Sequence, residues 1–257
     1  MPFASFHSNQ PGFRKMGGMF DRLRKKSKPS QVFPAVPLDF KAPIREIRYA
    51  VIDTELTGLN EKTDSIVSIG ALHIYKARIE LGYTFYRLVK PRTTMGTEGI
   101  LIHEITPAEV EEEPEIDLLL KDFLSFCENC VLVGHCIPID LTFLNQEVQR
   151  IQKSTITNPV LDTAALYRWL WGKWSATPSF SLAPGFADLY QMAGQLGVEA
   201  EGAHNAIQDA MITAQLFQRF IPWIEKSGIQ NLEELLQIGD PYKGGETFRS
   251  PQQLTNL

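Results

Sequence analysis

The sequence predicts an α/β fold in which helices flank a mixed β-sheet. Three strand patterns follow one another between residues 49 and 89, and from residue 107 onward helical patterns are mixed with a short apolar strand. The composition agrees, because 44% hydrophobic and 21% charged residues are typical of a soluble globular protein. The 257 residues suffice for one sizeable domain with extensions, or for two small domains.

The strand patterns are apolar and rich in β-branched and aromatic residues. The first, Tyr49–Asp53, has the continuous apolar run of a buried strand, and the next two cover Ser65–Ile74 and Gly82–Val89. The short segment Gly58–Asp64 between the first two predicts an antiparallel hairpin. A fourth, short strand is expected at Val131–Val133.

Helical patterns account for much of the chain between residues 107 and 226. Pro138 stands in the first turn of its helix, where proline is tolerated because its missing N–H would have no intrahelical partner. In the last helix, Ala206, Ala210 and Ala214 form a stripe of small side chains that permits a close approach to a sheet. The expected helices are Pro107–Val110, Ile116–Cys127, Pro138–Arg150, Thr163–Trp171, Phe186–Gln195 and Ala206–Lys226.

The distribution of charge divides the chain into unlike parts. Residues 1–45 form a basic extension that contains prolines and glycines, residues 46–226 form the compact domain, and residues 227–257 form a C-terminal tail. The extension carries nine Lys or Arg against two Asp, and its basic run Arg22–Lys28 fits a solvated tail, a membrane contact or a nucleic-acid contact. The acidic remainder argues against a broad DNA-coating surface, but not against a groove for a few nucleotides.

Several classes of protein are disfavoured. No stretch approaches the roughly 20 apolar residues that span a bilayer, and no apolar segment of a secretory signal follows the N-terminus. The three cysteines are an odd number, which does not favour a disulfide framework and indicates a reducing, cytoplasmic setting. The sequence also lacks the glycine-rich phosphate loop of P-loop nucleotide hydrolases.

Two acids at the end of the first strand give the strongest sign of chemistry. Asp53 and Glu55 point to the same face, because side chains alternate along a strand. Carboxylates at close range repel each other, and a divalent cation such as Mg²⁺ or Mn²⁺ relieves that repulsion. Taken alone, the pair also fits two solvated acids at a strand end, so the rest of the chain decides.

Two further acids stand near the starts of predicted helices. Asp140 lies in a first helical turn, where the helix dipole alone would favour an acid. Asp209 lies beside the alanine stripe, so its short side chain can reach the strand ends. His204 precedes the same helix, in a loop from which its ring can swing toward the same place.

Three motifs in order carry a resemblance to a known family. Asp53-Thr-Glu-Leu-Thr-Gly58, Gly134-His-Cys-Ile-Pro-Ile-Asp140 and His204-Asn-Ala-Ile-Gln-Asp209 are similar to the motifs of the DEDDh 3′–5′ exonucleases. This DnaQ-like family includes the proofreading epsilon subunit of bacterial DNA polymerase III. The resemblance covers about residues 47–220 and implies a ribonuclease H-like fold in a single domain.

The resemblance also implies a role for each residue of the motifs. Asp53, Glu55, Asp140 and Asp209 would hold two Mg²⁺ or Mn²⁺ ions, which generate the attacking hydroxide and stabilise the leaving 3′ oxygen. His204 would be the general base, and the product would be a nucleoside 5′-monophosphate. The substrate is expected to be a single-stranded 3′ end, of DNA or RNA. The residues expected to contact its terminal nucleotide are Leu56, Thr57, Gly58 and His103.

The chain departs from the family pattern at three positions. Leu56 replaces a Thr, Cys136 replaces a common Asn, and Glu104 replaces a Gly in the segment Ile102–Thr106. None of these changes removes a metal ligand or the base, so the implied catalysis stands. The added acid at Glu104 is expected to affect how the substrate strand is held.

Two other functions remain open on the sequence. One is an exoribonuclease of the same family that processes RNA, and the other is a non-catalytic module that docks on a DNA polymerase. The final segment Gln252–Leu257 faintly resembles peptides that dock on sliding clamps, although a frayed terminus is the simpler interpretation.

Other residues with chemical potential are expected to be structural. Cys127 and Cys130 have the spacing of half a zinc site, but no second pair follows them. Trp169, Trp171 and Trp174 fit core packing or a protein interface better than stacking on bases. His73 is also expected to be structural, and His135 is expected either to pack or to support a neighbouring site residue rather than to bind a metal.

Overall fold

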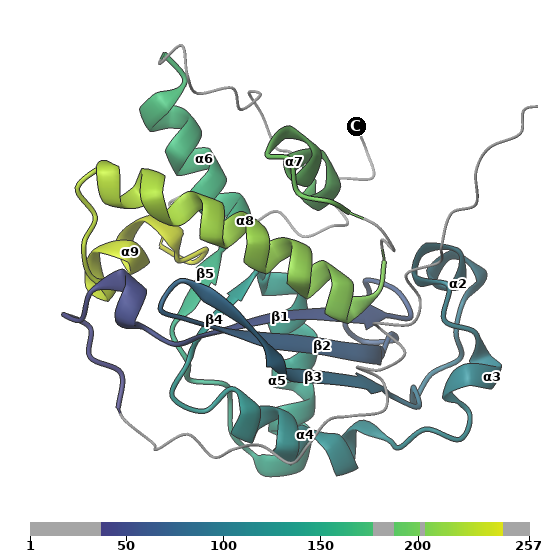
Figure 1. The fold of residues 1–257 in the computed structure, drawn as a ribbon. Coiled ribbons are helices and arrows are strands. Elements are labelled where there is room, and N and C mark those ends of the chain that lie inside the picture. Colours follow the sequence, from purple (N-terminus) through teal and green to yellow (C-terminus); the bar gives the residue numbers. More distant parts are fainter. Residues whose placement is uncertain (1–36, 177–187, 201–203, 244–257) are drawn as a thin grey trace, which may run out of the picture.

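The computed structural model describes residues 37–176, 188–200 and 204–243, and Figure 1 shows their arrangement. The strands are β1 (Tyr49–Leu56), β2 (Ile66–Tyr75), β3 (Arg78–Leu88), β4 (Val131–Gly134) and β5 (Val160–Asp162). The helices are η1 (Ile44–Glu46), α2 (Thr97–His103), α3 (Pro107–Val110), α4 (Ile116–Phe126), α5 (Pro138–Gln152), α6 (Thr163–Trp174), α7 (Leu189–Gln195), α8 (Ala206–Lys226) and α9 (Leu232–Gly239).

The strands form one mixed sheet in the order β3-β2-β1-β4-β5. β1 is central, because it pairs antiparallel with β2 on one side and parallel with β4 on the other. The hairpin expected around Gly58–Asp64 joins β1 to β2. The fold class predicted from the sequence, a mixed sheet flanked by helices, is confirmed.

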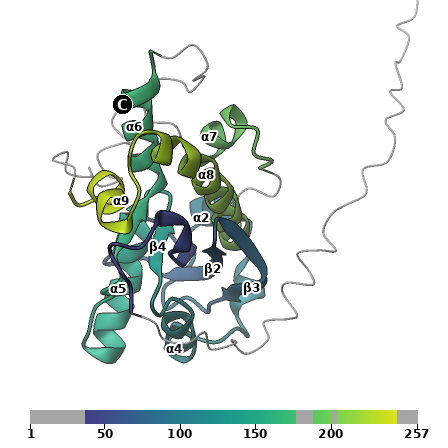
Figure 2. The same cartoon turned by 60° about the vertical axis from the view of Figure 1, so that its left-hand side comes forward.

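The side chains of β1 divide between two cores, one on each face of the sheet. Tyr49 and Val51 pack with α6, α7, α8 and α9, whereas Ala50 and Ile52 pack with α4 and α5. Figures 1 and 2 show α8 lying across one face of the sheet. Because side chains alternate along a strand, odd-numbered residues of β1 face α8 and even-numbered residues face α5.

Polar caps fix where the helices begin. Asp162 caps α6, Asp188 caps α7, Asn205 caps α8 and Asn231 caps α9, each by accepting a hydrogen bond from a backbone N–H of the first turn. A cap of this kind stabilises a helix by about 1 kcal/mol. The capped first turn of α8 carries Asp209, so the cap also helps to place a predicted site residue.

The folded unit extends past both boundaries that the sequence predicts for the domain. Ile44, from the end of the basic extension, is buried in the core beside α8. Leu232 and Leu235 of α9, from the predicted tail, are buried in the same core. Backbone hydrogen bonds join residues 40–44 to residues 230–233, so these two segments close the fold together.

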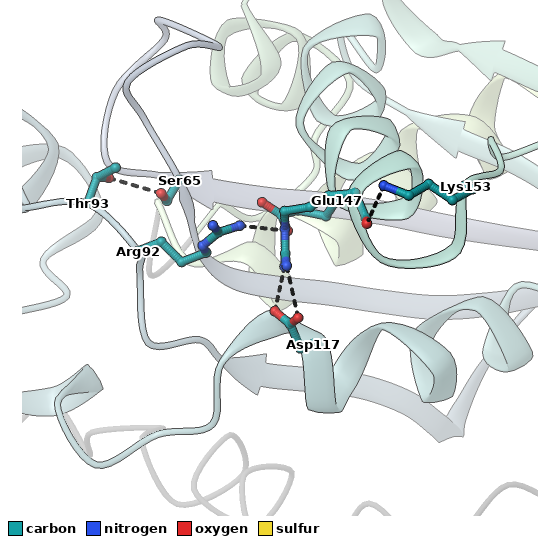
Figure 3. Close-up of polar contacts among 7 residues, drawn as sticks. Ser65, Arg92, Thr93, Asp117, Glu147 and Lys153 are labelled. Atoms are coloured by element: carbon teal, nitrogen blue, oxygen red, sulfur yellow. Dashed lines mark hydrogen bonds and ion pairs between the residues drawn. The ribbon is translucent and has the colours of Figure 1, made fainter.

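A network of charged side chains ties α5 to α4 (Figure 3). Arg150 on α5 donates to both carboxylate oxygens of Asp117 on α4, at 2.9 and 2.5 Å, and to Glu147 at 2.6 Å. Glu147 also lies 3.8 Å from Arg92, in the segment after β3. Partly exposed pairs of this kind contribute at most about 1 kcal/mol each. Their effect here is to fix the helix whose first turn carries Asp140.

The tryptophans of α6 pack against the core, as the sequence predicts. Trp169, Trp171 and Trp174 are partly buried on the core that contains α8. Trp174 Nε1 donates to Ser227 Oγ at 2.8 Å, and its ring meets Trp223 edge-on with 5.2 Å between centroids. These contacts anchor the end of α6 to the end of α8.

Two sequence features lie outside the described residues, namely the basic run Arg22–Lys28 and the final segment Gln252–Leu257. Within the described ranges, no helix combines the length and the apolar composition that crossing a membrane requires.

Candidate active site

The end of β1 carries two of the predicted acids on the face that α8 covers. Asp53 and Glu55 continue the odd-numbered series of Tyr49 and Val51. Glu55 is 8% exposed, and Asp53 is partly exposed at the same edge. The register with β2 shifts between Glu55 and Leu56, and such an irregularity bends a strand and redirects nearby side chains.

α8 reaches this edge because a glycine lies beneath its first turn. A Cβ atom at Gly70 of β2 would lie 2.3 Å from the backbone of Ala206 and Ile207. Gly70 pairs with Asp53 in the sheet, so the start of α8 lies directly beside the acids of β1. Asp209, in this first turn, is 6% exposed and turns toward the same edge.

Asp53, Glu55 and Asp209 form a group in which one carboxylate oxygen of each residue lies within 4.8 Å of the others. Two oxygens of these residues, Glu55 Oε1 and Asp209 Oδ1, are buried and accept no hydrogen bond. A buried polar atom without a partner is costly unless a donor or a cation satisfies it. Clustered carboxylate oxygens are the ligands that Mg²⁺ and Mn²⁺ take, so the three residues fit a hard divalent cation.

Asp140 approaches the same edge from the opposite layer. Its Oδ1 accepts two hydrogen bonds from Thr54, one from the backbone N at 2.8 Å and one from Oγ1 at 2.6 Å. Thr54 is the even-numbered residue between the two acids of β1, so it faces α5. Asp140 therefore lies next to the three-carboxylate group without belonging to it, and its charge still raises the pKa of Asp53 and Glu55.

Burial raises the pKa of all four acids. The pKa of Glu55 rises to about 8 through burial and then through repulsion from Asp209 and Asp140. The pKa of Asp140 rises to about 7 through burial, against the opposing hydrogen bonds from Thr54. Burial, followed by the neighbouring acids, raises the pKa of Asp53 well above its usual value, and burial also raises the pKa of Asp209. A bound cation would favour the ionised forms and release protons.

His204 stands beside Asp209, just before α8, and its ring is exposed. Its backbone N donates to Tyr190 Oη at 2.8 Å, and its Nδ1 lies 3.2 Å from the same oxygen. Tyr190 Oη in turn donates to Asp209 Oδ2 at 2.6 Å.

The sequence did not predict Tyr190 as a site residue, because it belongs to no motif and only the docking of α7 brings it here. The sequence also did not predict Thr54, which strand alternation could have placed on the side of α5.

The residues predicted to contact a terminal nucleotide gather around this edge. Leu56 ends β1 and packs partly against the core of α4 and α5. Thr57 Oγ1 donates to Asp64 Oδ1 at 2.9 Å and accepts from Ser65 N at 3.0 Å, so its hydroxyl holds the loop after β1. A Cβ atom at Gly58 would lie 2.6 Å from the Asp64 carboxylate, so the loop folds back where a side chain would not fit.

α2 brings His103 to the same place. A Cβ atom at Gly99 of α2 would lie 2.9 Å from the carbonyl oxygen of Thr57, so the helix packs directly on the loop after β1. His103 Nδ1 accepts a hydrogen bond from Ile105 N at 3.1 Å, which leaves the hydrogen of the neutral ring on Nε2. That Nε2 is buried and has no hydrogen-bond partner. Burial lowers the pKa of His103, and the nearby His204 lowers it further.

His73 and His135 have the packing roles that the sequence predicts. His73 Nε2 lies 2.9 Å from the carbonyl oxygen of Phe126, and the two rings stack with 4.1 Å between centroids. His135 Nδ1 lies 3.0 Å from a threonine hydroxyl at the start of α6. Cys127 and Cys130 are buried free thiols. Among the described residues, the cysteines belong to no group of three or more potential metal ligands.

Comparison with known proteins relates the chain to DNA polymerase III proteins. The exonuclease family model, RNase_T, matches residues 50–217. The DNA polymerase III PolC-type of Thermotoga petrophila is 30% identical over 212 residues, which cover 82% of this chain and 15% of the relative. A DNA polymerase III subunit epsilon-like protein of Rhodobacter capsulatus is 33% identical over 199 residues, which cover 76% of this chain and 27% of the relative. The chain thus spans well under a third of the length of these relatives.

Solved structures of exonucleases have the same fold. Exonuclease X in complex with 5′-overhanging duplex DNA gives a TM-score of 0.54 at 22% identity, covering 74% of this chain and 98% of that one. E. coli Exonuclease I in complex with a dT13 oligonucleotide gives 0.60 at 16% identity, covering 71% of this chain and 42% of that one. These likenesses establish a single domain of the ribonuclease H-like type. With the family match over residues 50–217, they show that the chain belongs to the exonuclease family, among its DnaQ-like members.

Proposed function

We propose that the chain is a divalent-metal-dependent 3′–5′ exonuclease that hydrolyses single-stranded DNA ends to nucleoside 5′-monophosphates. One observation carries the proposal: Glu55 Oε1 and Asp209 Oδ1 are buried without hydrogen-bond partners, in a group with Asp53 that spans 4.8 Å. Such a group is unfavourable in a metal-free protein and becomes favourable around a hard cation. Membership of the exonuclease family supplies the class of reaction.

The four acids take unequal parts in the proposed site. Asp53, Glu55 and Asp209 would hold one ion directly. Asp140 has its Oδ1 engaged by Thr54, so its Oδ2 is the oxygen left to help hold a second ion. When bound, the two Mg²⁺ or Mn²⁺ ions supply Lewis acidity, which ionises the attacking water and stabilises the leaving 3′ oxygen. The chain itself fixes the positions of the carboxylate oxygens.

His204 is the proposed general base. Its exposed ring stands next to Asp209, where a water molecule held at the carboxylates can pass it a proton. Imidazole is the side chain best suited to exchange protons near neutral pH. The hydroxide then attacks the phosphorus of the last phosphodiester, and the bond from phosphorus to the 3′ oxygen of the preceding nucleotide breaks. That oxygen takes a proton from water, and the terminal nucleotide leaves with the phosphate on its 5′ side.

The surrounding residues are proposed to hold the end of the strand. His103 offers Nε2–H, a buried donor without a partner, to a phosphate oxygen of the substrate. Leu56 offers an apolar contact to the terminal base. Because the Thr57 hydroxyl is engaged within its own loop, Thr57 and Gly58 are proposed to act through their backbone.

DNA is proposed as the substrate because the relatives named above are DNA polymerase III proteins. For the same reason, a DNA polymerase is the proposed protein partner. A sliding clamp is the alternative partner, which the resemblance of the segment Gln252–Leu257 to clamp-docking peptides suggests. All three cysteines are free thiols, which supports a reducing, cytoplasmic setting. An exoribonuclease is the alternative, and it differs only in the sugar that the site accepts.

A cleavage assay on matched DNA and RNA oligonucleotides, labelled at either end, tests this function. We expect Mg²⁺ or Mn²⁺ to support release of mononucleotides from the 3′ end of DNA, and EDTA to abolish it. Asp53→Asn should lower the rate by at least about 100-fold without unfolding the protein. Asp122→Asn, a matched change at an exposed position of α4, should leave the rate unchanged. Full activity of Asp53→Asn would refute the assignment, and faster digestion of RNA would favour the alternative.

A further inference from the structure

Tyr190 connects two residues of the proposed active site through one hydroxyl group. Its Oη donates to Asp209 Oδ2 at 2.6 Å, accepts from His204 N at 2.8 Å, and lies 3.2 Å from His204 Nδ1. The Tyr190 and His204 rings meet edge to face, with 4.9 Å between centroids. α7 packs against α8 (Figure 2). Its residue Tyr190 thereby contacts His204 and Asp209 at the start of α8.

The single hydrogen of the phenol decides the direction of these bonds. The short contact with Asp209 Oδ2 takes that hydrogen, since a carboxylate can only accept. At His204 Nδ1 the phenol oxygen must therefore accept, which places the hydrogen of the neutral imidazole on Nδ1. The lone pair of the ring is then on Nε2, and this is the nitrogen that can take a proton.

The same contacts restrict Asp209. Its Oδ2 is engaged by Tyr190, whereas its Oδ1 is buried and has no hydrogen-bond partner. The carboxylate is thereby held in one orientation, with Oδ1 as the oxygen that remains for a cation. His204 is held in a left-handed backbone conformation, with φ at 64°, by the hydrogen bond from its N to Tyr190. Such a conformation is unfavourable for a residue with a side chain and needs a contact that holds it.

α7 provides a firm base for this contact. Leu189, Met192 and Ala193 are buried against the core, and Asp188 caps the helix. At the other end of α7, Gln195 Oε1 accepts a hydrogen bond from Tyr167 Oη on α6 at 3.0 Å. α7 is thus tied at one end to the core through Tyr167, and its start carries Tyr190 to the site.

We propose that Tyr190 is a positioning residue that orients Asp209 for the cation and fixes the tautomer and position of His204. This inference rests on the proposed metal-dependent hydrolysis and adds a role outside the three sequence motifs. Removing the hydroxyl frees the Asp209 carboxylate to rotate and leaves the His204 loop without its anchor. Both metal binding and the rate at saturating metal should then suffer.

The test compares Tyr190→Phe with Tyr167→Phe in the full chain. Each change deletes one phenol hydroxyl. The hydroxyl of Tyr190, on α7, contacts Asp209 of the site, whereas the hydroxyl of Tyr167, on α6, contacts Gln195 at the far end of α7. We expect Tyr190→Phe to weaken Mn²⁺ binding by about tenfold, measured by calorimetry without nucleic acid. At saturating Mn²⁺ its kcat should fall by about tenfold with little change in KM. Tyr167→Phe should bind Mn²⁺ like the original protein, and thermal unfolding of both variants checks that they fold.

A double-mutant cycle with His204→Ala separates positioning from a general structural effect. If Tyr190 acts through His204, Tyr190→Phe should lower kcat less than about twofold in the His204→Ala background. An equal fall in both backgrounds would overturn the role of Tyr190 toward His204, and unchanged Mn²⁺ binding in Tyr190→Phe would overturn its role toward Asp209, while the hydrolase assignment stands in both cases. A parent chain that neither binds Mn²⁺ nor cleaves DNA would overturn the proposed function, and the inference with it.

Discussion

Asp140 differs from the other acids in what holds it. Two hydrogen bonds from Thr54 fix one of its oxygens, and they stabilise its ionised form against the effect of burial. Burial and the charges of neighbouring acids instead raise the pKa of Asp53 and of Glu55, the latter to about 8. The donor on Thr54 therefore sets how readily Asp140 ionises near neutral pH.

Replacing Thr54 with Val removes the side-chain donor but keeps the shape. Because a hydrogen bond to a carboxylate lowers its pKa, its loss should raise the pKa of Asp140 above about 7. In the metal-free protein, the titration profile of the Asp140 carboxyl should then move by about one unit to higher pH, measured by NMR in EDTA. Thr142→Val is the matched control, since its Oγ1 donates to Pro138 O instead. An unchanged profile in Thr54→Val would show that Asp140 does not need this donor.

Two departures from the family pattern occur at left-handed backbone positions. Cys136 has φ at 55° and stands where the family pattern commonly has Asn. Glu104 has φ at 56° and stands where the family pattern has Gly. Gly and Asn are the residues that tolerate this region best, which explains the family pattern in physical terms. Both residues therefore carry backbone strain that the sequence comparison alone did not reveal.

Glu104→Gly should stabilise the protein by about 1 kcal/mol, because Glu104 ends α2 in the left-handed conformation. Ser175 ends α6 with φ at −56°, so Ser175→Gly should bring no such gain. Urea unfolding of both variants measures the difference. A destabilised Glu104→Gly would mean that the carboxylate makes a contact that outweighs the strain.

At the scale of elements, the pattern of the sequence predicted the long, regular parts well. The observed α8 has the predicted bounds, and β1 to β4 lie within a few residues of the predicted strands. β5 has only three residues, and α2 exposes Leu101 and Ile102, so neither has a readable periodicity. α9 did have a signal, because Leu232, Leu235 and Leu236 follow helical spacing. The four acids and His204 were identified from motifs, whereas Tyr190 and the separation of Asp140 depend on how the layers meet.

The close contact between β2 and α8 is the element-scale feature that the site depends on. Gly70→Ala would place a methyl group 2.3 Å from the α8 backbone, so the helix must shift. We expect a loss of stability of about 3 kcal/mol and weaker Mn²⁺ binding, because Asp209 moves with the helix. Gly82→Ala in β3 is the matched control, since nothing lies within 4 Å of its added Cβ. Urea unfolding and calorimetry measure both effects, and equal behaviour of the two variants would contradict this view.

For the whole molecule, the buried acids link folding to pH and to metal. Glu55 and Asp140 ionise near 4.5 and 3.8 when exposed, and their pKa values rise to about 8 and about 7 in the folded chain. The folded state therefore binds more protons than the unfolded state between these limits. The contribution of these two groups to the free energy of unfolding is fully present at pH values below their unfolded-state pKa values. It is lost as the pH rises through their folded-state pKa values of about 7 and about 8.

The metal-free protein should accordingly be less stable at about pH 8 than at about pH 5.5, measured by urea unfolding in EDTA. Mg²⁺ or Mn²⁺ should stabilise it more at the higher pH, because fewer protons must be displaced. In Glu55→Gln the loss of stability with pH should be smaller, because one of the groups with a raised pKa is gone. A metal-free protein that gains stability across this range would contradict the assignment of buried, crowded acids.

The backbone bonds between residues 40–44 and 230–233 have a consequence for architecture. They hold the segment before η1 against the start of α9, close to the first residues of β1. The carboxylates lie toward the other end of the same strand, roughly 20 Å away at the rise of an extended chain. Cutting back either segment would therefore uncover the buried side chains of Ile44 and Leu232 at the end of β1 that lies away from the carboxylates.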